Sequence, residues 1–172
     1  VYCAEGCRNH CLNMRFYGSA MPFPHIQGAF RERLVASAYQ CAPTGSLSLG
    51  EAAMAEPLAV VLHGLRRAGE MVGKKVLITG CGPIGMLCLL AARRAGAVEI
   101  VMTDIAESAL ANARDCGADC VINTKDEPEL LAAYGDDKGY FDVMFECTGA
   151  APALIGGLTA VRPRAVIVQL GM

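Results

Sequence analysis

This chain lacks the features that would suit it to a nucleic acid or a membrane. Its 15 lysines and arginines are outnumbered by 17 acidic residues, and the formal net charge of −2 provides no basic surface for phosphates. No apolar run approaches the roughly 18 residues that a membrane helix needs, because the best stretch contains Glu56, Pro57 and His63. There is no tryptophan and no repeat of fixed period. We therefore expect a globular protein with neither nucleic acid nor membrane as a partner.

Cysteine, by contrast, is abundant, with nine residues in 172. Six of them are scattered in or beside apolar segments, which is unlike the clustering of a secreted disulfide framework. This pattern predicts buried, reduced thiols and a cytoplasmic location. The six are Cys41, Cys81, Cys88, Cys116, Cys120 and Cys147.

The other three cysteines are evenly spaced in VYCAEGCRNHC, at Cys3, Cys7 and Cys11. This C-x3-C-x3-C spacing differs from the common iron–sulfur patterns and lacks the C-x2-C pairs of zinc ribbons. From the spacing alone, a metal site, a disulfide, a redox device and buried thiols all remain open. The chain starts at Val1 and stops on a strand pattern, so we expect an excerpt of a longer protein.

The pattern of residues changes near residue 50. Up to that point the chain is rich in turns, and only residues 30–43 have the polar alternation of a strand. Residues 48–69 then predict a helix, with basic residues in its last turn and glycine after it.

Beyond residue 70, short apolar strands alternate with helices. Expected strands lie at 75–79, 98–104, 120–123, 140–149 and 165–171, and expected helices at 83–96, 105–117 and 151–161. The charged residues 125–139 predict a solvated connection. Such alternation is typical of right-handed βαβ units, and it predicts an α/β fold whose doubly wound parallel sheet is covered on both faces.

A glycine loop, VLITGCGPIG, connects the first of these strands to its helix. Gly80, Gly82 and Gly85 form G-x-G-x-x-G, which is the dinucleotide-binding pattern when it lies between a strand and a helix. Gly80 would allow the tight turn, Gly82 the approach of a pyrophosphate, and Gly85 close helix–strand packing. Asp104 ends the next strand, where an acid binds the ribose hydroxyls, and Ile105 directly after it is a further candidate for cofactor binding.

Two other interpretations of this loop remain open. It could be a tight turn that binds nothing, with Asp104 capping the next helix. It could also belong to a methyltransferase that binds S-adenosylmethionine, although the third glycine favours a nicotinamide dinucleotide. Asp104 would repel a 2′-phosphate, and Ile105 and the residues after it include no arginine to receive one. NAD is therefore expected over NADP.

Four stretches resemble the zinc-containing medium-chain dehydrogenases, and within them the sorbitol dehydrogenase branch. They are MRFYGSAMPFPHIQGAF, EPLAVVLHGLRRAG, GCGPIG and FECTG, and the first is specific to the polyol and idonate enzymes of that branch. The resemblance implies a GroES-like, mostly-β catalytic domain ending at residue 55. It also implies an NAD-binding Rossmann domain over 56–172 that has five of its six strands, and a homo-oligomeric full-length enzyme.

The resemblance also implies chemistry. A zinc ion would hold the alkoxide of a polyol or sugar acid while hydride passes to NAD, with L-idonate and 5-keto-D-gluconate as the expected pair. Glu56 of the EPL sequence would lie at or beside that zinc. The early cysteine and His-Glu pair of the family have no counterpart here, so we expect this chain alone to be inactive.

The same resemblance assigns further residues to metal and cofactor. Cys3 and Cys11 would be the last two ligands of a four-cysteine structural zinc lobe, with Cys7 an extra residue. Pro83 and Ile84 would cover the pyrophosphate, Cys147, Thr148 and Gly149 would line the ligand crevice, and Leu170, Gly171 and Met172 would approach the nicotinamide. Ser108 and Ala109 occupy the positions where the family often has an arginine beside the adenine.

Three more residues are conspicuous. Phe23 and His25 could line a polyol pocket, although a histidine in a loop is more often solvated or structural. His63 is expected to be a hydrogen-bonded histidine of the core, because its helix is largely apolar.

Overall fold

The computed structural model describes residues 1–171, so Met172 and its expected cofactor contact lie outside the described residues. The chain divides into two compact units, Val1–Gly45 and Ser46–Met172. The domain boundary expected after residue 55 stays a prediction about the longer enzyme.

The first unit is built from turns, with two short 3-10 helices, η1 (Arg8–His10) and η2 (Ala38–Gln40). Ser19 is its one fully buried residue. The strand expected at residues 30–43 is wrong, since these residues form bends, extended segments and η2. A strand needs a neighbour for its backbone N–H and C=O groups, and no strand is assigned in residues 1–45 to pair with it.

The helix expected at 48–69 is present, but it is divided into α1 (Leu49–Ala53) and α2 (Ala55–Ala68). Ser48 and Glu51 form a capping box at its start, and Gly69 follows its end. The division reflects Pro57, which has no N–H to donate to the carbonyl of Ala53. Within residues 1–171, no helix has the length and apolar character needed to cross a membrane.

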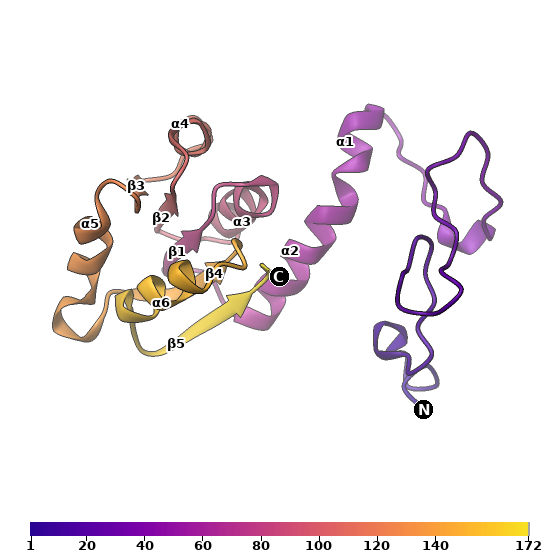
Figure 1. Ribbon diagram of the computed structural model, residues 1–172, viewed down its shortest axis with the longest axis horizontal. Coiled ribbons are helices and arrows are strands. Elements are labelled where there is room, and N and C mark those ends of the chain that lie inside the picture. Colours follow the sequence, from indigo (N-terminus) through magenta and orange to yellow (C-terminus); the bar gives the residue numbers. More distant parts are fainter. Residues whose placement is uncertain (172) are drawn as a thin grey trace. The chain divides into compact units, whose positions relative to one another are not determined.

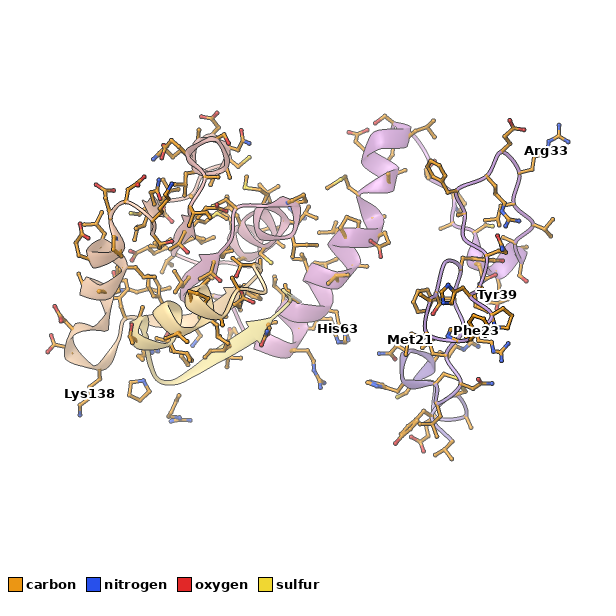
Figure 2. The ribbon with its side chains drawn as sticks, in the orientation of Figure 1. Met21, Phe23, Arg33, Tyr39, His63 and Lys138 are labelled. Carbon is orange, nitrogen blue, oxygen red and sulfur yellow. The ribbon has the colours of Figure 1, made fainter. Side chains whose placement is uncertain are left out.

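His63 lies on the exposed side of α2 rather than in the core (Figure 2). The buried positions of this helix are Val61, Gly64, Leu65 and Ala68, which follow a three- and four-residue spacing. His63 falls between them, about 200° around the helix from Val61. The expectation of a buried, hydrogen-bonded histidine is therefore wrong.

The second unit contains a five-stranded sheet in the order β3-β2-β1-β4-β5, with every pairing parallel. The doubly wound α/β fold expected from the sequence is confirmed (Figure 1). The strands are β1 (Lys75–Thr79), β2 (Glu99–Asp104), β3 (Cys120–Asn123), β4 (Phe141–Glu146) and β5 (Val161–Gln169). The helices between them include α3 (Pro83–Arg94), α4 (Glu107–Asp115) and α6 (Ala151–Ala160).

The charged connection at 125–139 contains more structure than expected. It forms α5 (Pro128–Ala132) and the 3-10 helix η3 (Ala133–Lys138). Proline begins α5, where its missing N–H costs no helical hydrogen bond, and Leu131 is buried in the core. The solvated connection is therefore corrected to a short helical segment anchored by one leucine.

The apolar core consists of two clusters, one on each face of the sheet. One cluster joins α2, α3 and α4 to the sheet through residues such as Val76 and Ile78. The other joins α5 and α6 to the sheet through residues such as Leu77 and Met144. Successive side chains of β1 therefore point to opposite faces, and both faces are covered.

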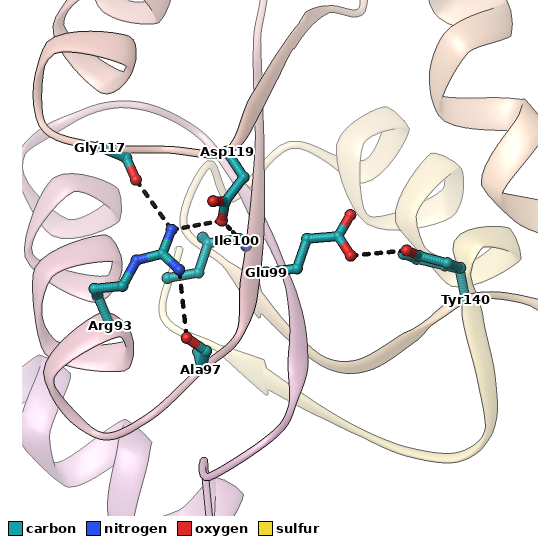
Figure 3. Close-up of polar contacts among 7 residues, drawn as sticks. All are labelled: Arg93, Ala97, Glu99, Ile100, Gly117, Asp119 and Tyr140. Carbon is teal, nitrogen blue, oxygen red and sulfur yellow. Dashed lines mark hydrogen bonds and ion pairs between the residues drawn. The ribbon is translucent and has the colours of Figure 1, made fainter.

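A polar network fastens the amino-terminal ends of the strands (Figure 3). The Arg93 guanidinium donates to the carbonyls of Ala97 and Gly117 and pairs with Asp119. Asp119 also accepts the N–H of Ile100 at 2.6 Å. Burial alone would raise the pKa of Asp119, but the bonds from Arg93 and Ile100 outweigh it and hold that pKa below its ordinary value.

Candidate functional site

The opposite, carboxyl-terminal ends of β1, β2 and β4 meet at one cavity of about 490 Å³. β1 and β4 are neighbours in the sheet although two strands separate them in sequence, so this is the switch point at which such folds bind ligands. The cavity is lined by Gly80, Gly82, Thr103, Asp104, Ile105, Cys147, Thr148, Ala150, Pro152 and Ala153. Six residues expected to bind a dinucleotide are therefore brought together.

Two of the loop glycines are required by close packing. Gly80 has φ +91°, and its N–H donates to the Thr103 carbonyl at 2.7 Å. A Cβ on Gly80 would lie 2.9 Å from Cγ2 of Thr148. A Cβ on Gly85 would lie 1.9 Å from the Gly80 carbonyl oxygen, so only glycine lets α3 start this close to the loop.

Gly82 differs from these two glycines because nothing occupies the space beside it. Its φ of −73° is accessible to any residue, and a Cβ there would have no protein atom within 4 Å. It lies at the cavity wall, as the residue that precedes Pro83 at the first position of α3. The unpaired N–H groups and positive end of this 12-residue helix face a space that a phosphate can fill. Pro83 and Ile84 do not line the cavity, and Ile84 packs against the core.

Asp104 fastens the loop as well as lining the cavity. Its Oδ2 accepts the Cys81 N–H at 2.7 Å, and its Oδ1 accepts the N–H groups of Ile105 and Ala106 at 2.7 and 2.9 Å. This carboxylate stabilises the turn before α4, and Asp104 also lines the cavity, while its contact with a ribose stays a prediction. A carboxylate has about four lone-pair positions, so three backbone bonds leave acceptor capacity for a ribose hydroxyl.

Glu146, the last residue of β4, organises the other side of the site and was not predicted as a site residue from the sequence. It is fully buried, and its carboxylate accepts the N–H of Thr148 at 2.7 Å and that of Gly149 at 3.1 Å. The hydroxyls of Thr148 and Thr79 also donate to it. The signal available in the sequence was an acid that ends a strand with mostly apolar residues, since a buried carboxylate needs a dedicated set of donors.

Leu170 and Gly171 follow β5 and meet the same residue. Their N–H groups donate to the Glu146 carbonyl at 2.8 and 2.9 Å. A Cβ on Gly171 would lie 2.1 Å from the Gly149 nitrogen and 2.8 Å from Oε2 of Glu146, so the close approach requires glycine. Neither Leu170 nor Gly171 lines the cavity, and their approach to a nicotinamide stays a prediction.

Three thiols lie in the core beneath these loops. Cys81 and Cys88 are buried, and the Cys88 and Cys147 sulfurs are 3.9 Å apart. Burial, with a contribution from the Asp104 charge, raises the pKa of Cys81 to about 12. The thiol contact with Cys88, together with burial, raises the pKa of Cys147 well above its ordinary value. Cys81 and Cys147 are thereby held as thiols, as expected for inert core cysteines. Cys41, Cys116 and Cys120 are exposed, so the expectation that all six scattered cysteines are buried is wrong for these three.

The expected catalytic metal residue, Glu56, is exposed near the start of α2. Among residues 1–171, no group of three or more His, Cys, Asp and Glu side chains is arranged to hold a metal ion. These residues therefore do not fit a complete zinc site, and the roles of Glu56, Cys3 and Cys11 as ligands stay predictions.

Cys3 and Cys11 do lie beside each other in the first unit. A hydrogen bond with the Cys11 thiol raises the pKa of Cys3 above its ordinary value. Both line a hollow with Arg8, Asn13, Met14, Arg15 and Tyr39. The Cys7 thiol instead faces the carbonyl of Glu5 at 3.9 Å. Cys3 and Cys11 thus lie together and Cys7 lies apart from them, as the resemblance to a zinc lobe implies.

Phe23 and His25 are exposed in the same unit (Figure 2 labels Phe23). Their rings meet edge to face with centroids 6.0 Å apart. Neither ring lines the hollow formed by Cys3, Cys11 and their neighbours, and a substrate-lining role stays a prediction.

Comparison with known proteins places this geometry in a family. The family described as "Zinc-binding dehydrogenase" matches residues 83–172. The chain is 41% identical to L-idonate 5-dehydrogenase (NAD(P)(+)) of Escherichia coli strain K12, over 99% of this chain and 50% of the relative. It is 38% identical to sorbitol dehydrogenase of Homo sapiens, over 74% of this chain and 36% of that protein.

A solved structure supports the same relationship. The crystal structure of L-idonate 5-dehydrogenase from Escherichia coli matches with a TM-score of 0.93 at 41% identity. The match covers 99% of this chain and 49% of that chain. The chain thus spans about half the length of the relatives that it matches over its full extent.

Proposed function

Because this chain belongs to the zinc-binding dehydrogenase family, we propose that it is the dinucleotide-binding part of an NAD-dependent polyol or sugar-acid dehydrogenase. One observation carries the proposal. The glycine loop, Asp104 and the turn after β4 enclose one cavity, and the space beside Gly82 is open for a pyrophosphate.

Each part of the cavity has a task in binding. The first turn of α3 supplies unpaired N–H groups and the positive end of its dipole to the phosphates. Asp104 accepts from a ribose hydroxyl and repels a 2′-phosphate, which supports NAD over NADP. Cys147 and Thr148 form the wall on the β4 side. When bound, the nicotinamide ring of NAD supplies the hydride acceptor.

For the whole enzyme, L-idonate is the substrate that we propose, with other polyols as the alternative. The support is the 41% identity to the L-idonate enzyme and 38% identity to sorbitol dehydrogenase. Residues 1–171 do not provide a complete zinc site. We accordingly expect the 172-residue chain alone to bind dinucleotide without oxidising L-idonate.

The test is a titration of the 172-residue chain with NADH, followed by fluorescence or calorimetry. Gly82→Ala places a methyl group in the open space of the cradle, so we expect binding to weaken by at least tenfold while the fold is retained. Gly50→Ala is the matched control, because a Cβ at that position also meets no atom within 4 Å, but it lies in α1.

Three results would contradict the proposal. The first is a wild-type chain that binds neither NADH nor NAD. The second is a Gly82→Ala chain that binds as tightly as the Gly50→Ala control. The third is tight binding of S-adenosylmethionine without NAD, which would restore the methyltransferase interpretation of the glycine loop.

A further inference from the structure

Glu146 is a buried carboxylate without a cation. It is 0% exposed at the end of β4, and no ion pair involves it within the described part of the chain. An ionised group in such a position is costly unless donors surround it. The sequence could place a leucine or valine at this point of the strand, yet an acid is present.

The donors around Glu146 suit its ionised form. Two of them are backbone N–H groups, from Thr148 and Gly149, which can only donate. The Thr148 hydroxyl accepts from the Ala150 N–H at 2.9 Å, which leaves its proton for Glu146. The Thr79 hydroxyl, 3.4 Å from Oε1, is the weakest of the four donors. All four contacts are therefore donors to the carboxylate, an arrangement that suits an anion and adds no positive charge beside it.

This charge lies where three segments of the site meet. Thr79 ends β1 just before the glycine loop, Thr148 belongs to the cavity wall, and Gly171 follows β5. Gly171 approaches so closely that a Cβ there would lie 2.8 Å from Oε2. Leu170 and Gly171 form the segment expected to approach the nicotinamide. Because their N–H groups donate to the Glu146 carbonyl, Glu146 lies directly beneath that segment.

We propose that Glu146 is a positioning residue that also sets the relative affinity of the site for the oxidised and reduced forms of its cofactor. The inference rests on the proposed function, since it requires a nicotinamide dinucleotide in the cavity. The oxidised nicotinamide ring carries a positive charge and the reduced ring is neutral. A fixed negative charge in the protein therefore favours the oxidised form, whereas the hydrogen bonds that order the turn act on both forms alike.

The measured quantity is the ratio of the dissociation constants for NAD and NADH, obtained with the 172-residue chain. Glu146→Gln removes the charge and keeps an oxygen acceptor for the turn. We expect it to weaken NAD binding by roughly tenfold relative to NADH, because the removed charge attracts only the positively charged ring. Glu146→Asp keeps the charge and should hold the ratio within about twofold of wild type.

Thr79→Val provides a test in the opposite direction. It removes one donor from the carboxylate without changing charge or shape, so the charge is less compensated. We expect the ratio to move toward tighter NAD binding by about twofold. Thermal unfolding of each variant establishes that it is folded. If Glu146→Gln does not fold, the Thr79→Val result decides the proposal.

The outcomes separate this inference from the function on which it rests. If wild type binds neither form, the proposed function fails. If wild type binds both forms, and Glu146→Gln weakens them equally or leaves both unchanged, Glu146 has no influence on oxidation state and this inference alone is overturned. An unchanged ratio in Thr79→Val, where Glu146→Gln is unfolded, overturns it in the same way.

Discussion

The two compact units of this chain differ in what holds them together. Residues 46–171 bury two apolar clusters on the faces of a parallel sheet. Residues 1–45 bury only Ser19 completely and are held by backbone turns and two 3-10 helices. The proposed dinucleotide site is therefore supported by a core of its own, whereas the first unit has almost no core to support a site.

The largest difference should appear when one aromatic ring is removed from each unit. Phe145 is 0% exposed near the carboxyl end of β4, and Phe23 is 94% exposed. Phe145→Ala should lower the free energy of unfolding by about 3–5 kcal/mol, because it leaves a cavity in the core. Phe23→Ala should change it by less than about 0.5 kcal/mol. Urea unfolding measures both, and equal losses would end the distinction between the units.

The sequence predicted the packed unit well for a physical reason. Its strands and helices repeat apolar residues at the periods of regular structure, and Gly80, Gly85 and Asp104 fulfil local requirements of the turn that they form. The position of Glu146 beneath the loops depends on which strands are neighbours, and a single strand does not contain that information. The prediction for His63 was wrong because the apolar character of a whole helix does not say on which side of it one residue lies.

The first unit could be predicted less well because its contacts are not periodic. The alternation at residues 30–43 resembles a strand, but no strand in residues 1–45 is available to pair with it. The spacing of Cys3 and Cys11, in contrast, anticipated their contact through the resemblance to a zinc lobe. In the first unit, the spacing of two cysteines was therefore informative, while the strand-like alternation of residues 30–43 was not.

A smaller difference is expected in the reactivity of exposed and buried cysteine thiols. Cys3, Cys7 and Cys41 of the first unit are exposed, as are Cys116 and Cys120 at the surface of the second, whereas Cys81 and Cys88 in the core of the second unit are buried. At pH 8 a thiol reagent should modify the exposed group at least tenfold faster, since burial raises the pKa of Cys81 to about 12. Mass spectrometry of tryptic peptides locates each product. Rapid labelling of Cys81 in the folded chain would contradict the described core.

The smallest effect concerns Asp119, whose pKa is held below its ordinary value. Its contribution to stability is present above its unfolded-state pKa of about 3.9 and is lost as pH falls through the lower folded-state value. Asp119→Asn should therefore cost about 0.5–1 kcal/mol at pH 7, and the cost should be smaller at pH 2. Glu5→Gln, at an exposed position of the first unit, is the control and should change little at either pH. Denaturant melts at the two pH values check this, and a cost for Asp119→Asn that does not change with pH would contradict it.

The central claim is that the cavity at the carboxyl ends of β1, β2 and β4 binds NAD, and amide chemical shifts of the 172-residue chain test it most directly. On addition of NAD, the largest changes should fall in residues 80–86, 104–106 and 147–149, which form the cavity and the start of α3. A different hollow, lined by Lys74, Asp142 and Arg162, lies where the strands begin. Changes confined to that hollow, or no changes at all, would contradict the account.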